Sequence, residues 1–230
     1  MGTTQYVALL RAINVGGRTV KMDALRGACE AIGLTSVETF IASGNVIFES
    51  RAGAAGLETK IEAHLRSVLG YEVAAFVRSV PELAAAAAHC ETLLRKGEGA
   101  HIGFLKAPVG KDGQTRVAAY QTADERFAFA GREIFWLTRA GIGQSKFSNA
   151  VFERIIKSPA TFRNVTTVRK LAEVLEVSER VVVLRNGRVV AEGPASGFDA
   201  EALMAMPVRE NLRNAPTTAT TTGDSSSMPL

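Results

Sequence analysis

The segment Tyr6–Gly17, with the sequence YVALLRAINVGG, begins as a hydrophobic strand and ends in a polar turn. Arg11 shares its side of a period-2 strand with apolar residues. An arginine there either extends to the sheet edge or is held by a partner, because an unpaired buried guanidinium is costly. Gly16 and Gly17 let the backbone turn sharply or approach a ligand closely. We interpret Arg11, Asn14, Gly16 and Gly17 as one wall of a polar site, with a purely structural role as the alternative.

The elements that follow this strand have the order of a ferredoxin-like fold. Apolar residues at helical spacing predict one helix that ends at Gly33 and another that ends at Gly70. Further strands are expected at residues 38–41, 45–49 and 72–78. The resulting order is βαββαβ, in which two helices cover one face of a four-stranded antiparallel sheet.

The same order recurs downstream. Ser79 and Glu82 have the spacing of a capping box, with Pro81 in the first turn, and they predict an alanine-rich linker helix. The next expected elements are a strand 101–105, a helix 112–121, a hairpin 126–130 with 133–137, a helix 147–156 and a helix within 161–175. Four residues also recur 87 positions apart: Phe40, Gly44, Ile47 and Phe48 correspond to Phe127, Gly131, Ile134 and Phe135. Together these observations favour an internal duplication.

The sequence therefore predicts an α+β fold of two ferredoxin-like halves followed by an appendage. The expected divisions are 1–79 for the first half and 80–178 for the linker helix and second half. Residues 179–213 are expected to form an appended β-hairpin, turned at Asn186 and Gly187, and a short helix. Residues 214–230 are polar and of low complexity, and we expect them to be disordered.

Composition limits the functional classes. Hydrophobic residues make up 47% of the 230 residues and charged residues 22%, which is ordinary for a soluble globular protein. The net charge of +4 permits phosphate or nucleic-acid partners, but the basic residues are scattered, so nucleic-acid binding is not favoured. Two cysteines without a CxxC motif are typical of reduced thiols in a cytosolic protein. No apolar segment approaches the ~20 residues of a membrane span, so we expect a cytoplasmic protein.

Two further polar clusters lie at expected turns. Ser43 and Asn45 flank Gly44 in a hairpin, where they either shape the turn or contribute to a ligand site. Within Gly141–Lys146, backbone amides and Lys146 at a helix N-terminus could hold an anion. This segment is not a dinucleotide-binding motif, because Lys146 occupies the third glycine position of GxGxxG.

A fourth cluster crowds an expected helix start. Either Asn164 or Thr161 could be the N-cap, and Arg163 could extend toward the other half or toward a ligand. Capping and surface charge are the alternative for each residue taken alone. Four such clusters nonetheless indicate a shared cleft between the two halves.

The usual constellations of enzymes and metal sites are absent from the sequence. His64, His89 and His101 have no metal-ligand spacing, and there is no GxSxG motif or marked carboxylate pair. No cofactor is expected. The sequence also offers no activated nucleophile or general base beside Arg11.

Three motifs carry a resemblance to a known family. LLRAINVGG (Leu9–Gly17), SGNVIF (Ser43–Phe48) and TFRNVTTVRKL (Thr161–Leu171) resemble domain-of-unknown-function family 1697, a group of bacterial proteins, over about residues 6–177. The resemblance implies paired ferredoxin-like halves and no substrate. Ala12 departs from a usual glycine, and Val165 departs from a common tryptophan.

A second resemblance concerns residues 179–206. The stretch Arg180–Pro194, RVVVLRNGRVVAEGP, is similar to the C-terminal part of ATP-binding subunits of sugar-type transporters. The chain has no phosphate-cradling GxxxxGK[ST] loop, so ATP hydrolysis does not transfer.

The leading hypothesis is a protein that binds a phosphate-bearing small molecule or nucleotide in the cleft between the halves. The alternatives are an enzyme of unknown reaction that uses the same cleft, and nucleic-acid binding on an open sheet face with exposed aromatic residues. In the leading hypothesis, charge comes from Arg11, Lys146 and Arg163, and orientation from Asn14, Ser43, Asn45 and Asn164.

Overall fold

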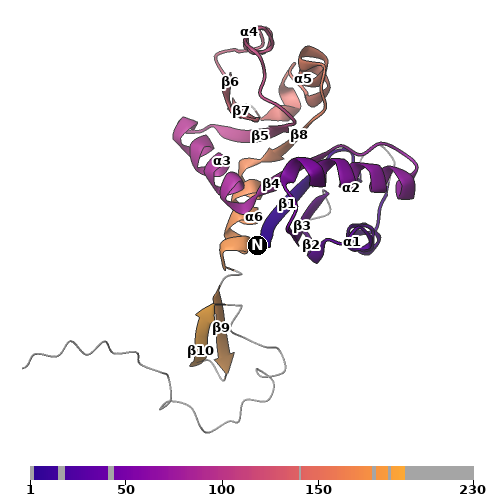
Figure 1. Ribbon diagram of the computed structural model, residues 1–230. Coiled ribbons are helices and arrows are strands. Elements are labelled where there is room, and N and C mark those ends of the chain that lie inside the picture. The colour runs from indigo at the N-terminus through magenta and orange to yellow at the C-terminus, as the bar shows by residue number, and fades with distance from the viewer. Residues whose placement is uncertain are drawn as a thin grey trace, which may run out of the picture. The chain divides into compact units, whose positions relative to one another are not determined.

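Two four-stranded antiparallel sheets account for most of the folded chain in the computed structural model (Figure 1). The structure describes residues 3–14, 19–40, 44–139, 141–177, 180–185 and 188–194. The chain divides into two units, residues 1–176 and residues 177–230, and both sheets belong to the first. The predicted α+β fold with two ferredoxin-like halves is confirmed.

The first half has the strand order β2-β3-β1-β4. Its second helix ends as the sequence predicts, because Gly70 adopts a left-handed conformation with φ 75° at the C-terminus. Its elements are β1 (Thr4–Leu10), α1 (Met22–Ala31), β2 (Thr35–Phe40), β3 (Asn45–Ser50), α2 (Ala54–Leu69) and β4 (Ala75–Ser79).

The second half has the equivalent order β6-β7-β5-β8. The linker helix α3 (Val80–Leu93) begins with the predicted capping box, in which Ser79 and Glu82 bond each other's backbone amides. The other elements are β5 (Gly99–Leu105), α4 (Lys111–Ala118), β6 (Glu125–Ala130), β7 (Glu133–Thr138), η1 (Ile142–Gln144), α5 (Asn149–Ile156), β8 (Ala160–Asn164) and α6 (Val165–Val177).

Of the two predicted N-caps for the helix within 161–175, Thr161 is wrong and Asn164 is correct. Thr161 and Arg163 lie in strand β8, which pairs with β5 and completes the second sheet. A strand of five residues that carries three polar side chains has too little apolar alternation to be recognised locally. The helix begins one residue after Asn164, whose Oδ1 accepts the Thr166 amide at 2.8 Å, so the predicted N-cap role of Asn164 is confirmed.

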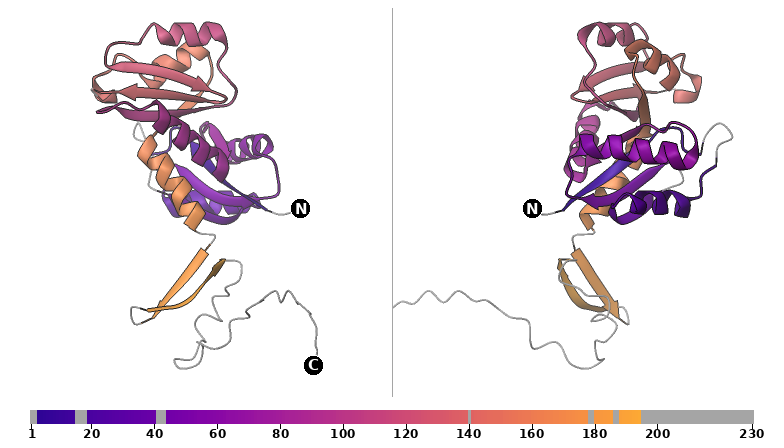
Figure 2. Two further views of the ribbon diagram at one scale, coloured as in Figure 1. Left: turned by 90° about the vertical axis from the view of Figure 1, so that its left-hand side faces the viewer. Right: turned by 45° about the vertical axis from the view of Figure 1, so that its right-hand side comes forward.

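Alternating residues of the strands divide the interior into three cores. One face of the first sheet packs on α1 and α2, and one face of the second sheet packs on α4 and α5. The opposite faces of both sheets contribute to a shared core together with α3 and α6, which run between the halves (Figure 2). The fully buried residues of the shared core include Val7, Leu9, Phe76, Leu83, Cys90, Ile102, Phe104, Val168 and Leu171.

The shared core covers the sheet face that the nucleic-acid-binding alternative requires to be open. The aromatic residues Phe104 and Phe135 on the central strands of the second sheet are 0% and 1% exposed, inside this core. They are not available to stack on bases. This face of the second sheet therefore does not meet the requirement of the nucleic-acid alternative.

The register of the sheets also corrects the residue matches proposed from the sequence. Val7 of β1 pairs with Ile47, and Ile102 of β5 pairs with Phe135. Ile47 is therefore equivalent to Phe135, and both side chains lie in the shared core. Ile134 instead lies in the core between the second sheet and helices α4 and α5, which we call the outer core of the second half. The repeated element order stands, but the matches of Ile47 and Phe48 at a spacing of 87 are one residue out of register, and Phe40 is equivalent to Ala130 rather than to Phe127.

The loop before β5 is held by an ion pair that should make stability depend on pH. Arg126 donates to both carboxylate oxygens of Glu98, at 3.2 and 2.7 Å. These hydrogen bonds hold the pKa of Glu98 below its ordinary value. Because an unfolded glutamate titrates near pH 4.3, the contribution of Glu98 to stability is present above that pH and is lost as the pH falls through the lower folded value.

Glu98→Gln is therefore expected to destabilise the protein at about pH 7 and to have a much smaller effect at about pH 3. Urea denaturation of both proteins across this range measures the difference in unfolding free energy. A difference that does not change with pH would contradict the assignment.

The second unit contains the predicted hairpin, with β9 (Arg180–Arg185) antiparallel to β10 (Arg188–Pro194). The turn residues Asn186 and Gly187, the predicted short helix and the tail 214–230 lie outside the described residues. No helix in the described part of the chain is long and apolar enough to cross a membrane.

Candidate functional site at the junction of the halves

Two arginines at equivalent positions join the halves. Arg78 of β4 pairs in register with Val7, and Arg163 of β8 pairs with Ile102, the equivalent residue of the second sheet. Arg78 Nη2 donates to the carbonyl of Leu105 at 2.9 Å, at the end of β5. Arg163 Nη2 donates to the carbonyl at the end of β1, that of Leu10, also at 2.9 Å. Each sheet therefore holds the other by an arginine from its last strand, an arrangement we call the arginine clasp.

The two sides of the clasp differ in charge. Arg78 Nε donates to the Glu133 carboxylate at 2.7 Å, whereas Arg163 Nε donates to the Asn45 amide oxygen at 2.7 Å. Glu133 and Asn45 are the first residues of β7 and β3 and are equivalent in register. Burial lowers the pKa of the Arg163 guanidinium to about 10, so it remains charged at neutral pH.

A second pair of contacts follows the same symmetry. Arg11, directly after β1, donates from Nε and Nη2 to Glu153 of α5, each at 2.6 Å. Lys106, directly after β5, pairs with Glu62 of α2 at 2.6 Å. Each of these glutamates also accepts, at 2.8 Å, the amide of the first residue of the last strand in its own half. Each half thus presents a carboxylate to the cation that follows the first strand of the other half.

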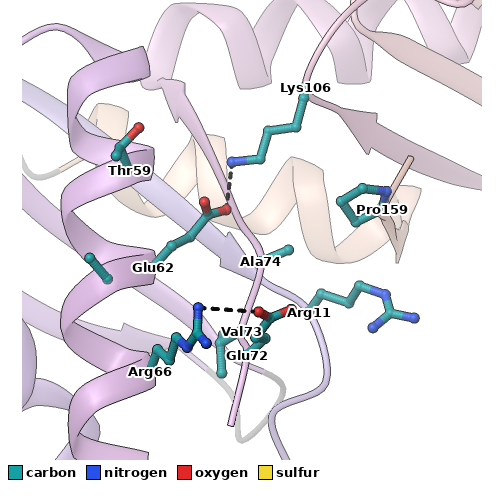
Figure 3. Close-up of a pocket in the computed structure, with 10 residues that line it drawn as sticks. Arg11, Thr59, Glu62, Arg66, Glu72, Val73, Ala74, Lys106 and Pro159 are labelled. Atoms are coloured by element: carbon teal, nitrogen blue, oxygen red, sulfur yellow. Dashed lines mark ion pairs between the residues drawn. The ribbon is translucent and has the colours of Figure 1, made fainter. Parts of the chain in front are cut away.

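A cavity of about 560 Å³ lies at this junction. In Figure 3, Lys106 reaches Glu62 and Arg66 reaches Glu72, while the guanidinium of Arg11 points away from both carboxylates. We call this the junction cavity, and its lining residues are Arg11, Thr59, Glu62, Ala63, Arg66, Glu72, Val73, Ala74, Lys106 and Pro159.

The three cations of the junction cavity are bound with different strength. Lys106 has three partners, because its ammonium contacts Glu58 at 3.0 Å, Glu62 at 2.6 Å and the carbonyl of Ala75. Arg66 pairs with Glu72 at 3.4 Å, but these side chains are 69% and 83% exposed. Such an exposed pair contributes little stability and exchanges readily.

Arg11 is intermediate between these two. Its side chain is 39% exposed, and its contact with Glu153 uses Nε and Nη2. Among the described residues no group accepts a hydrogen bond from Nη1, so both of its hydrogens are available to another acceptor. Arg66 and Arg11 are the cations of the cavity that a ligand could reach.

The structure separates the residues that the sequence placed in one site. Arg163 and Asn45 contact each other, and Arg163 binds the residue that precedes Arg11.

Asn14 has φ 56°, and its Oδ1 accepts the Val20 amide at 2.7 Å, which is the turn-forming alternative. Asn164 caps α6, and Lys146 lines a different cavity. Gly16, Gly17 and Ser43 lie outside the described residues.

Of the polar residues at the junction, the sequence indicated Arg11, Asn45 and Arg163 alone. It did not single out Arg78, Lys106, Glu62, Glu133 or Glu153. Arg78 carried a usable signal, because it lies on the same face of a strand as the apolar Phe76, two residues before it. This is the pattern that drew attention to Arg11. The glutamates carried none, since a carboxylate on a helix, as at Glu62 and Glu153, or at the start of a strand, as at Glu133, is usually solvated.

The chain is similar in structure to the conserved bacterial protein SP0830 from Streptococcus pneumoniae, with a TM-score of 0.55 and 27% sequence identity. That match covers 76% of this chain and 99% of the other. No curated protein matches the sequence. The resemblance of residues 179–206 to transporter subunits stays a prediction.

Residues 3–135 match the family described as "Protein of unknown function (DUF1697)". This range includes all of the first half and most of the second sheet. The chain therefore belongs to the DUF1697 family of proteins of unknown function.

Proposed function

We propose that the protein binds a phosphate-bearing small molecule or nucleotide in the junction cavity. The observation that carries the proposal is that Arg11, Arg66 and Lys106, from segments of both halves, line one cavity of about 560 Å³. This volume lies within the range of roughly 300–1,000 Å³ that is usual for small-molecule sites. Cations from several elements are what recognition of a phosphate group requires.

The exposed ion pair between Arg66 and Glu72 explains how an anion would enter the junction cavity. A phosphate group carries more charge than the Glu72 carboxylate and can replace it on the exposed Arg66. The unused Nη1 of Arg11 would supply a second donor, while Lys106 stays bound to Glu62 and offsets its charge. The ligand would thus be held by guanidinium groups, which match phosphate oxygens with two parallel hydrogen bonds.

Arg163 and Asn45 belong to this proposal as positioning residues. Both support the end of β1, where the Leu10 carbonyl accepts from Arg163 at 2.9 Å. That contact fixes the backbone from which Arg11 projects. Gly16, Gly17 and Ser43 stay predicted ligand residues on the sequence alone, and Lys146 is not part of the proposed site.

A binding role fits the state of the cysteines. Cys29 and Cys90 are buried free thiols, and burial raises the pKa of each to about 11. They therefore remain protonated and are poor nucleophiles at neutral pH. Reduced thiols of this kind also fit the cytoplasmic location that we propose.

Arg66→Ala tests the proposal in the full-length chain. Isothermal titration with pyrophosphate, ATP and glucose 6-phosphate measures the affinity, and a thermal melt measures the stability. We expect at least one probe to bind the wild type, and the variant to lose about tenfold or more in affinity. Its melting temperature should change little, since an exposed ion pair contributes about 0–1 kcal/mol.

Arg26→Ala is the matched control. Arg26 is 49% exposed on α1, pairs with Asp23 and Glu30 of its own helix, and does not line the cavity. It should bind like the wild type. A wild type that binds none of the three probes, or an Arg66→Ala protein with unchanged affinity, would sink the proposal.

A further inference from the structure

The side of α2 that lines the junction cavity carries three polar residues in succession. Thr59, Glu62 and Arg66 follow one another at spacings of three and four residues, which places them on one side of the helix. Figure 3 shows them in this order along α2, with their side chains directed to the same side. Successive members are about one helical turn, or ~5 Å, apart along the helix axis, so a single small molecule can contact all three.

Two of these residues offer hydrogen-bond acceptors to the cavity. Thr59 is exposed, and its hydroxyl donates its one hydrogen to the carbonyl of Ala55 at 3.3 Å, so toward a ligand its oxygen is an acceptor. Glu62 Oε1 accepts the Ala75 amide at 2.8 Å and contacts Lys106 at 2.6 Å. In the described part of the chain, no group donates to the other oxygen, Oε2, and the side chain is 33% exposed. A ligand beside Thr59 and Glu62 must therefore supply donors.

The cavity offers no stacking surface for a nucleobase. None of the described residues that line it is aromatic, and the apolar ones are small: Ala63, Val73, Ala74 and Pro159. Single nucleotide bases are usually held by stacking on aromatic rings or on guanidinium planes. Arg11 and Arg66 are the groups that the phosphate would occupy, so they are not free to stack on a base.

We propose that the ligand of the junction cavity is a sugar phosphate rather than a nucleotide. This inference rests on the proposed function, in which Arg11 and Arg66 hold the phosphate group. Hydroxyl groups of the same ligand donate to Glu62 Oε2 and Thr59 Oγ1, one and two turns along α2 from Arg66. A hydrogen bond from a hydroxyl to a carboxylate is charge-assisted, so it adds affinity that a phosphate ester without hydroxyl groups lacks.

Three phosphate monoesters test this inference by isothermal titration into the full-length chain. Ethyl phosphate has no hydroxyl groups, glucose 6-phosphate adds them, and AMP carries a nucleobase. We expect glucose 6-phosphate to bind at least about tenfold more tightly than ethyl phosphate, the gain of one or two hydrogen bonds. AMP should bind no more tightly than glucose 6-phosphate, because its base meets no stacking partner.

Thr59→Val removes one acceptor at nearly constant shape. The ratio of the ethyl phosphate Kd to the glucose 6-phosphate Kd should fall about threefold to tenfold. The matched control is Thr115→Val on α4. Thr115 is also exposed, donates to the carbonyl of Lys111 four residues before it at 3.0 Å, and does not line the cavity, so this variant should keep the wild-type ratio.

Glu62→Gln removes the charge of the second acceptor, and the same ratio should fall, because the hydrogen bond to the ligand is no longer charge-assisted. The inference is overturned, while the proposed function stands, by any of three results. Ethyl phosphate binds the wild type as tightly as glucose 6-phosphate, AMP binds more tightly than glucose 6-phosphate, or neither Thr59→Val nor Glu62→Gln lowers the ratio. If none of the three monoesters binds, the proposed function fails together with the inference.

Discussion

Arg78→Ala is expected to lower the free energy of unfolding by about 3–5 kcal/mol, because it breaks a buried ion pair from one side. Arg78 is 1% exposed, and Nε pairs with Glu133 at 2.7 Å. The same guanidinium donates to the carbonyls of Val77, Leu105 and Arg132. Removing it leaves a carboxylate and several carbonyls of the clasp without their donor. Urea denaturation followed by circular dichroism measures this loss, which is a large part of the ~5–15 kcal/mol of a typical domain.

Arg132→Ala is the matched control for Arg78. The Arg132 side chain is 28% exposed and pairs with Glu82 at 3.0 Å near the surface, so its removal should cost about 1 kcal/mol or less. The double variant Arg78→Met with Glu133→Leu should recover much of the stability, because it removes this ion pair as a unit, and Glu58, which lies 3.8 Å from Arg78, keeps its ion pair with Lys106 at 3.0 Å. An Arg78→Ala protein that loses less than about 1 kcal/mol would show that the clasp is not a stabilising element.

Phe104→Ala is the second change with a large expected effect. Phe104 is fully buried in the shared core, and the Arg78 guanidinium lies 5.6 Å from its ring centroid. Replacing a buried phenylalanine with alanine costs about 3–5 kcal/mol through lost burial and the cavity left behind. Because this core contains side chains of both sheets, both halves should lose stability together. Trp136 fluorescence reports the second half, and hydrogen exchange of the β1 amides reports the first.

Phe127→Ala is the control that distinguishes a loss of stability in both halves from a loss in the second half alone. Phe127 is partly buried and packs against the outer core of the second half, 4.4 Å from Phe147 between ring centroids. Its loss should destabilise the protein less than the loss of Phe104. If Phe104→Ala speeds exchange in the second half and leaves the β1 amides protected, then the shared core does not couple the halves.

The arginine clasp links the fold to the proposed function. Equivalent arginines in two sheets of the same strand order fit the duplication that the sequence favours. Where Arg78 meets Glu133, the equivalent Arg163 meets the neutral Asn45. One side of the junction is thus an ion pair, and the other places a cation beside the end of β1. Because of this difference in residue type, an anion should bind more favourably near Arg11 than near Lys106, the equivalent residue of the second half.

The sequence by itself determined the fold class and the order of the elements in the first half. Helix ends such as Gly70 and the capping box of Ser79 and Glu82 depend on residues within one turn, so local reading identified them. The apolar run of Val7 and Leu9 likewise predicted a strand, but not that both of its faces are buried. Such local reading failed at β8, whose place in the sheet depends on pairing with β5 rather than on its own pattern.

Only the tertiary structure decided the partners of the polar residues. The sequence showed that Arg11 needed a partner or an exit to solvent, but Glu153 is 142 positions away. Arg163 and Asn45 are 118 positions apart, and each was singled out without its relation to the other. Local patterns record which face of an element is buried, because that follows from the spacing of its own side chains. Which charge meets which depends on how two sheets pack, and the residues around an arginine carry no record of that packing.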